Sequence, residues 1–185
     1  MIIDQLLKKL EQHSHIIVQA FADDIVIMVI GISGSTVSEL TQMGINLISR
    51  WCSSQGLKIS TEKTTAVKFS LNRKEISRTK VLKLNKNPIK YSSDMKYLGV
   101  TLDSKLTFKA HLENKLRQAY NALWTYKNYV GRSWEMSPKM MHWMYTAIVR
   151  PMLTYAPLIW FKEAAKKTYS LKLKRLQRLA CLLMQ

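Results

Sequence analysis

The sequence predicts an α+β protein in which a strand-rich first half is followed by a helical second half. Two apolar runs rich in Ile and Val, residues 16–21 and 25–30, flank Asp23-Asp24 and are typical of a β-hairpin. Behind Thr36, apolar residues recur at helical spacing. From about Thr107 onward, long amphipathic stretches replace the short strand candidates. These three patterns together indicate the α+β class.

The first elements follow from local patterns. Residues 1–12 predict a short helix, because their apolar side chains recur at helical spacing. Both arms of the following hairpin are almost wholly apolar, so we expect it to be covered on both faces. Thr36 and Glu39 have capping-box spacing and predict the start of a helix. Gly56 is expected to end that helix.

Short strand candidates come next, and helices then replace them. The candidates are residues 57–60, 65–70, 81–84, 89–91 and 96–102, with a turn at Asn85-Lys86-Asn87-Pro88. A long helix is expected over residues 108–130. Ser137-Pro138 predicts the start of a second helix, which Pro151 should kink or end, and a last basic amphipathic helix is expected over residues 166–183.

The charge balance points to a polyanionic partner. The 185 residues include 29 Lys and Arg and 12 Asp and Glu, a net charge of +17. Nucleic acid is the commonest partner of such a chain, and an anionic membrane surface is less common. Residues 1–90 carry 13 basic and 7 acidic groups, net +6, and residues 91–185 carry 16 and 5, net +11. The helical half therefore holds most of the positive charge.

Other patterns exclude several classes. Cys52 and Cys181 lack ligand spacing, which excludes a disulfide scaffold and a zinc module. The longest apolar run, residues 25–30, is too short to span a bilayer. The first twelve residues do not resemble a secretory signal. We therefore expect an intracellular protein that is not secreted and does not enter a membrane.

The acidic pair is the sharpest chemical feature. Adjacent carboxylates repel each other and bind protons or cations to relieve the repulsion. Projecting from a rigid hairpin, Asp23 and Asp24 could hold Mg²⁺, which prefers oxygen ligands. Two such ions can clamp the attacking and leaving oxygens of a phosphoryl transfer. The alternative is a solvated turn, in which Asp is common, although tight turns favour Asn-Gly or Asp-Gly.

Motifs in order along the chain carry a family resemblance. Phe21-Ala22-Asp23-Asp24 between two apolar strands resembles the catalytic hairpin of reverse transcriptases. Residues 51–64, with Gly56 and Lys63, resemble the helix, turn and lysine-bearing strand that follow it in that family. Residues 96–103 resemble the strand pair that grips the primer in reverse transcriptases of non-LTR, LINE-type retrotransposons, and residues 137–138, 145–156 and 178–181 resemble the thumb of the same family.

The resemblance implies a fold and a set of residue roles. The fold would be a partial polymerase palm, an antiparallel hairpin plus a helix, followed by a helical thumb. Residues 1–106 would form the C-terminal part of the palm with its primer-grip strands, and residues 107–185 a thumb truncated at its end. Asp23 and Asp24 would be catalytic carboxylates that bind the metal, with Asp23 the more direct ligand. Phe21 would lie near the primer end or the nucleotide sugar.

The resemblance also implies roles for Lys63, Leu98 and Gly99, and each of these roles has a simpler structural alternative. Lys63 would stabilise or protonate the leaving pyrophosphate; alternatively it is a surface lysine. The backbone of Leu98 and Gly99 would approach the primer closely; alternatively it is an ordinary strand with a glycine bulge. In the intact enzyme, Mg²⁺ would be the cofactor, and an RNA template, a DNA primer and deoxynucleoside triphosphates would be the partners, in the nucleus or the cytoplasm.

The resemblance is incomplete at the start of the chain. Polymerases of this family need a third carboxylate upstream of the hairpin and a loop that shapes the nucleotide pocket, and the twenty residues before Phe21 contain neither. We therefore expect a fragment of a retrotransposon RNA-directed DNA polymerase, catalytically inactive without the upstream fingers and palm portion of the same polyprotein. The alternative from a different class is a non-catalytic basic nucleic-acid-binding module whose hairpin is purely structural.

The helical half supports nucleic-acid binding. Its aromatic residues are expected mainly in the core, whereas its basic residues are expected to contact the nucleic-acid backbone. A third interpretation takes the helix at residues 166–183 as a membrane-surface or calmodulin-type helix. The basic residues proposed for backbone contact are Lys105, Lys109, Lys115, Arg117, Lys127 and Arg132.

Overall fold

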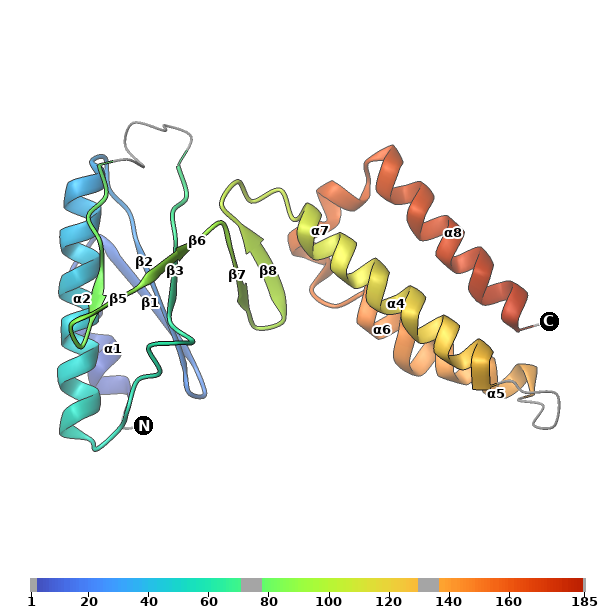
Figure 1. The fold of residues 1–185 in the computed structure, drawn as a ribbon, viewed down its shortest axis with the longest axis horizontal. Helices are drawn as coiled ribbons and strands as arrows, with labels where there is room; N and C mark the ends of the chain where they lie inside the picture. Colours follow the sequence, from blue (N-terminus) through green and yellow to red (C-terminus); the bar gives the residue numbers. More distant parts are fainter. Residues whose placement is uncertain (1–2, 71–77, 130–136, 185) are drawn as a thin grey trace. The chain divides into compact units, whose positions relative to one another are not determined.

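The computed structural model describes residues 3–70, 78–129 and 137–184 and confirms the α+β class. The chain divides into two compact units, an N-terminal unit, Met1–Met95, and a C-terminal unit, Lys96–Gln185 (Figure 1). The division between the units falls after Met95, and the palm–thumb boundary expected after residue 106 stays a prediction. Residues 100–103 are bonded to the helical part, for instance through the Thr101 amide and His111.

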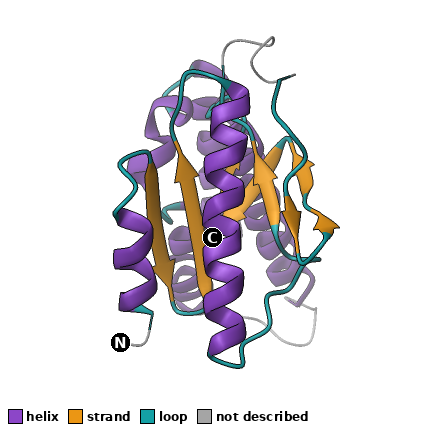
Figure 2. Cartoon of the chain, turned by 90° about the vertical axis from the view of Figure 1, so that its left-hand side faces the viewer, coloured by secondary structure: helices purple, strands orange, loops and turns teal. Residues whose placement is uncertain are grey.

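The N-terminal unit begins with the predicted short helix and hairpin. Its first elements are α1 (Asp4–Glu11), β1 (Ile16–Phe21), β2 (Asp24–Val29) and α2 (Gly34–Ser54). The two strands are antiparallel, and their register runs from Ile16 opposite Val29 to Phe21 opposite Asp24. Figure 2 shows the two strands beside α1 and α2. The core between them contains Leu6, Leu10, Val18, Ile48 and Cys52.

Only one face of the hairpin is covered. Residues directly opposite each other in an antiparallel pair share a face. Ile16 and Val18 are buried, whereas Ile17 and Met28, which lie opposite each other, are 49% and 51% exposed. Side chains of both helices join the core on the Val18 side, so the prediction of two covered faces is wrong for the described residues. The face that carries Ile17 and Met28 is called the open face below.

The start of α2 also differs from the prediction. The helix begins at Gly34, with Ser33 as its N-cap, so the capping box at Thr36 and Glu39 is wrong. Glu39 instead forms an exposed ion pair with Lys80, at 2.8 Å. The end of the helix is as expected: Gly56 follows the last turn with a φ of +71°, a conformation that glycine adopts without a Cβ penalty.

The remaining strands of this unit are short. β3 (Thr65–Val67) pairs in parallel with β6 (Lys90–Ser92), and β4 (Lys83–Leu84) pairs antiparallel with β5 (Asn87–Pro88). The predicted turn is centred on Asn85 and Lys86, both at positive φ. Residues 57–60, expected as a strand, form none.

The C-terminal unit is a hairpin followed by packed helices. Residues 96–102, expected as one strand, form β7 (Asp94–Tyr97) and β8 (Val100–Asp103) joined by a tight turn. The long helix is α4 (Lys109–Tyr129), close to its predicted range, and the last is α8 (Lys167–Leu183). Between them lie α5 (Pro138–Met144), α6 (Arg150–Leu153) and α7 (Pro157–Ala164). Their shared core contains Leu112, Leu116, Leu123, Val149, Trp160 and Leu176.

Pro151 alters its helix without ending it at once. Ser137 caps α5 as expected, and its hydroxyl accepts a hydrogen bond of 3.3 Å from the Met140 amide. A π-helical segment, η1 (Tyr145–Val149), then precedes Pro151 and leads into α6. Proline lacks an amide hydrogen, and its ring clashes with the carbonyl four residues earlier in an α-helix. Widening of the preceding turn relieves that clash.

Candidate functional site

The acidic tip of the β1–β2 hairpin is built from a two-residue connection. Phe21 pairs with Asp24, so the connecting residues are Ala22 and Asp23 rather than the two aspartates. Ala22 has a φ of +52°, which is unfavourable for an L-residue. Asp24 belongs to β2 and shares the open face with Phe21, while Asp23 projects from the turn itself. Both aspartates are exposed, and Phe21 is 61% exposed beside them.

The electrostatics of this tip suit a cation, but the ligand set is small. Within residues 3–70, 78–129 and 137–184, neither aspartate has a salt bridge or a side-chain hydrogen bond. Carboxylate oxygens are the donors that Mg²⁺ prefers. Among the same residues there is no group of three or more His, Cys, Asp or Glu that could hold a metal ion. The donor chemistry therefore fits a divalent metal, with two protein ligands available.

Lys63 is the next predicted site residue along the chain. It is exposed in a turn before β3, and its amide donates to the Ser60 hydroxyl at 3.3 Å. β3 pairs with β6, whereas β1 and β2 form a separate two-stranded sheet. Within the described part of the chain, no hydrogen bond or ion pair joins the Lys63 side chain to Asp23 or Asp24.

Leu98 and Gly99 form the turn of the second hairpin. Leu98 has a φ of +44° and Gly99 of +79°, so both residues are left-handed. Two consecutive positive φ angles are typical of the tight turns that join antiparallel strands. The glycine is therefore part of a hairpin turn and is not a bulge within a strand. Both residues of the turn are half-buried.

The basic residues of the C-terminal unit do not form a single row. Lys109, Arg117 and Lys127 are exposed on α4, and Lys105 is exposed in the segment before it. Successive helical residues turn by about 100°, so Lys109 and Lys127 share a side of α4 that is about 120° from Lys115. Lys115 is half-buried, with its Nζ 5.3 Å from the ring centre of Tyr155. Arg132 lies outside the described residues.

The aromatic residues of α4 divide between the core and the surface. Tyr120 and Tyr126 pack against the core, as expected. Trp124 is 49% exposed, and the Nζ of Lys127 lies 4.7 Å from its ring centre. Trp124 therefore lies on the surface, where its ring is accessible. This corrects the expectation that the aromatic residues of this helix belong mainly to the core.

Sequence reasoning missed three residues that shape the second hairpin. The Tyr155 hydroxyl donates to the Leu98 carbonyl at 2.7 Å. His111, 1% exposed, accepts a hydrogen bond from the Thr101 amide. Asp103 accepts hydrogen bonds from the amides of Thr107 and Phe108, at 3.0 and 2.7 Å. None of the three carries a local signal, because Asp103 stands six positions before α4 begins and not at the helix start that favours Asp.

Two of these residues have shifted pKa values. Burial lowers the pKa of His111, and the nearby charge of Lys115 lowers it further. Burial alone would raise the pKa of Asp103, but the hydrogen bonds from Thr107 and Phe108 outweigh it, and the pKa lies below its ordinary value. His111 is therefore neutral and Asp103 is ionised at neutral pH.

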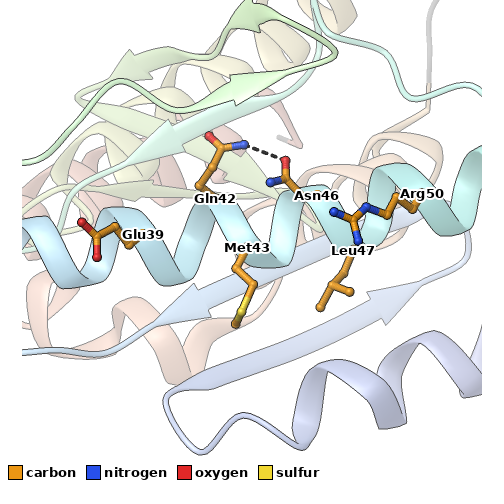
Figure 3. A pocket seen from close by; sticks show the side chains of 6 residues that line it. All are labelled: Glu39, Gln42, Met43, Asn46, Leu47 and Arg50. Atoms are coloured by element: carbon orange, nitrogen blue, oxygen red, sulfur yellow. Dashed lines mark hydrogen bonds between the residues drawn. The ribbon is translucent and has the colours of Figure 1, made fainter.

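A pocket of about 300 Å³ lies along α2, away from the acidic tip. Met43 and Leu47 point to one side of the helix, while Gln42 and Asn46 point to another and are hydrogen-bonded (Figure 3). Gln42 also bonds the backbone of Lys83 in both directions, at 2.8 Å. This polar row thus fixes β4 on α2, and no residue of the predicted site lines the pocket.

The structure weakens the third interpretation of the chain. Tyr169, Leu176 and Ala180 place one face of α8 in the core of the C-terminal unit. That face is already occupied and is not available to a lipid surface or to calmodulin. Among the described helices, none combines the length and the apolar composition that a membrane span requires.

Comparisons with known proteins identify relatives among retrotransposon proteins. A putative 115 kDa protein in the type-1 retrotransposable element R1DM of Drosophila melanogaster is 22% identical over 181 residues, which cover 98% of this chain and 17% of the relative. The probable RNA-directed DNA polymerase from transposon BS of the same species is 29% identical over 151 residues, 81% of this chain and 16% of the relative.

A further relative, the RNA-directed DNA polymerase from mobile element jockey of Drosophila melanogaster, is 27% identical over 175 residues. The chain spans 16% to 18% of the length of these three relatives. No solved structure matches the chain. Residues 1–102, which include the acidic hairpin and end within β8 of the second hairpin, match the family described as reverse transcriptase (RNA-dependent DNA polymerase). More than half of the sequence is thus accounted for by one family, and the chain belongs to the reverse transcriptases.

Proposed function

We propose that the chain is the C-terminal part of the palm and the thumb of a retrotransposon RNA-directed DNA polymerase. Residues 1–106 would belong to the palm and residues 107–185 to the thumb. The observation that carries the proposal is the acidic tip: in a region that matches the family, two exposed aspartates without counter-ions in the described chain stand beside an exposed aromatic residue. A solvated structural turn does not need that combination.

Asp23 and Asp24 are the proposed ligands of Mg²⁺. When bound, such ions supply the positive charge that stabilises the oxygens of nucleotidyl transfer to a primer 3′-OH. The two aspartates would hold the metal at the tip, and Asp24 would do so on the open face. Phe21, directly opposite Asp24, would pack against the primer end or the nucleotide sugar. Exposed Lys63 would offer its charge to the leaving pyrophosphate.

The C-terminal unit would bind the RNA template and the DNA primer. The left-handed backbone at Leu98 and Gly99 would contact the primer. The phosphate contacts would come from Lys105, Lys109, Lys115, Arg117, Lys127 and Arg132. Because Lys115 stands on a different side of α4 from Lys109 and Lys127, these residues would touch different strands or different stretches of one strand.

We further propose that the chain needs the rest of a polymerase for activity. The described residues offer two carboxylates at the tip and no larger cluster of metal ligands. The relatives are several times longer, and their matched regions are under a fifth of their length. Upstream fingers and palm residues of the same polyprotein would supply the remaining ligand and the nucleotide pocket. Deoxynucleoside triphosphates would be the substrates, in the nucleus or the cytoplasm.

The alternative is a non-catalytic basic nucleic-acid-binding module. The net charge of +17 and the absence of a larger ligand cluster in the described residues favour it. The two proposals differ at the acidic tip. In a polymerase the aspartates carry the reaction, whereas in a pure binding module they repel the ligand.

The test joins the chain, in one polypeptide, to the upstream polymerase portion of a related element. Mg²⁺-dependent primer extension on an RNA template and duplex binding are measured for Asp23→Asn, Asp24→Asn and the control Glu11→Gln. Glu11 is an exposed carboxylate of the same unit, at the end of α1. The proposal expects extension to fall by at least about 100-fold for both aspartate variants, as loss of metal-borne charge stabilisation implies. Binding should be kept, and full activity of both variants would support the binding module.

A further inference from the structure

The turn at Leu98 and Gly99 is strained and needs support from elsewhere in the molecule. A left-handed conformation is unfavourable for an L-residue, and Leu98 has a φ of +44°. A connection of two residues between short strands supplies few contacts of its own. Such a conformation persists only where surrounding structure holds it.

Tyr155 supplies this support. Its hydroxyl donates a hydrogen bond of 2.7 Å to the carbonyl of Leu98. Its ring also packs on Gly99, because a Cβ added there would lie 3.1 Å from Cε1 of Tyr155. One side chain, 57 positions away in the sequence, therefore contacts both residues of the turn.

Tyr155 is itself held in place by the core. Its carbonyl accepts a hydrogen bond of 2.9 Å from the indole of Trp160, which is 7% exposed. The His111 ring lies 6.4 Å from that indole, and His111 bonds the amide of Thr101 on β8. The second hairpin is thus tied to the same aromatic core at Leu98 and at Thr101.

The surface around Tyr155 remains accessible to a ligand. Tyr155 is 47% exposed although its hydroxyl is bonded, and Lys115 places a positive charge 5.3 Å from its ring centre. A cation, an aromatic ring and an ordered backbone turn therefore lie together. Such a combination can contact the phosphates and sugars of a nucleic-acid end.

We propose that Tyr155 is a positioning residue that holds the Leu98–Gly99 turn in one conformation, so that the turn meets the 3′ end of a primer at a fixed place. This inference rests on the proposed function, because the turn must contact a primer at all. Tyr155 would act through the turn and not on the reacting atoms. Loss of its hydroxyl should reduce the selection of a primer end more than the affinity for a duplex in general.

The test uses the full 185-residue chain and two RNA–DNA hybrids of equal length. One hybrid has a recessed DNA 3′ end, and the other is closed by loops so that no 3′ end is present. The measured quantity is the ratio of the two dissociation constants, called the end selectivity. The variants are Tyr155→Phe, which keeps the ring, and the control Tyr126→Phe, which removes a hydroxyl elsewhere in the same unit.

The expected result is preferential wild-type binding of the recessed end. Tyr155→Phe should lower end selectivity by about three- to tenfold, as expected for one hydrogen bond, with binding of the closed hybrid unchanged. Tyr126→Phe should leave the end selectivity unchanged. If Tyr155→Phe fails to fold, Gly99→Ala perturbs the same contact from the turn, at a φ of +79°, and should lower the same ratio.

The remaining outcomes separate the inference from the proposed function. Equal weakening of both hybrids by Tyr155→Phe would show a merely structural role and overturn the inference. Wild-type binding without any end selectivity would also overturn it while leaving the duplex-binding proposal standing. Failure of the wild-type chain to bind either hybrid would remove the proposed function on which the inference rests.

Discussion

The backbone amide of Thr101 on β8 donates a hydrogen bond of 3.2 Å to Nδ1 of His111 on α4. His111 is 1% exposed, and its Nε2 has no hydrogen-bond partner in the described chain. Nδ1 can accept this bond only while the imidazole is neutral. The attachment of the second hairpin to the helices therefore depends on the protonation state of one buried side chain.

The C-terminal unit should lose stability in mild acid because of His111. Burial and Lys115 hold the pKa of His111 in the folded state below its ordinary value of 6.5. The unfolded state then binds the proton more readily, so stability is full above pH 6.5 and falls as the pH decreases below it. Urea unfolding between pH 7.5 and 5.5 measures the effect. His111→Gln should flatten this dependence, whereas His142→Gln, at an exposed position, should not.

Asp103 should stabilise the start of α4. Its carboxylate accepts the Thr107 and Phe108 amides and the Thr107 hydroxyl. Asp103→Ala should lower the free energy of unfolding by about 1.5–3 kcal/mol at pH 7, as the loss of hydrogen bonds to a charged group does. Asp94→Ala, at an exposed position on β7, is the matched control, and an equal loss there would contradict the assignment.

The same carboxylate predicts a second acid transition. The pKa of Asp103 in the folded state is lowered from its ordinary value of 3.8. The contribution of Asp103 to stability is therefore present above pH 3.8 and is lost as the pH falls through the lowered pKa. In denaturation curves at pH 5 and pH 2.5, the difference between the wild type and Asp103→Ala should shrink at the lower pH.

The open face of the β1–β2 hairpin should limit solubility of the isolated chain. Ile17 and Met28 lie opposite each other and are half exposed, with Phe21 further along the same face. Contiguous exposed apolar surface of this kind promotes association. The double variant Ile17→Thr/Met28→Thr replaces both apolar side chains with threonine, which is compatible with a β-strand. It should raise the monomer fraction in size-exclusion chromatography. A clean wild-type monomer at high concentration would contradict this prediction.

Binding of an RNA–DNA duplex should weaken steeply with added salt. Each phosphate contact that is lost reduces the magnitude of the negative slope of log affinity against log salt by about 1. The double variant Lys109→Ala/Lys127→Ala removes two charges from one side of α4. The magnitude of the slope should therefore decrease by about 2 if both residues contact phosphates. Lys8→Ala in α1 is the control and should leave the slope unchanged. A flat salt response of the wild type would count against phosphate contacts.

The 185-residue chain alone should bind duplex without extending a primer. Its acidic tip offers two carboxylates, and the described residues contain no larger ligand cluster. Gel analysis of labelled primers incubated with Mg²⁺, nucleotides and an RNA template measures extension. Detectable extension by the purified chain would show that the catalytic set is complete within these residues.

Local patterns were sufficient for most of the secondary structure. The apolar arms on either side of Asp23-Asp24 predicted a hairpin within one residue of β1 and β2, and helical spacing predicted α1, α4 and α8. Gly56 ended α2 as expected. These features depend on residues close together in the chain, because periodicity and turn conformation are set by near neighbours. The family resemblance came from the same kind of local motif.

Packing between distant segments could not be read from these patterns. The hairpin arms are apolar throughout, yet both helices cover the Val18 side and leave Ile17 and Met28 exposed. Tyr155 reaches Leu98 across 57 positions, and no periodicity connects those two residues. Residues that are close together in the sequence determine the conformation of each segment. The burial of a face and the support of a turn depend instead on which distant segments pack against them.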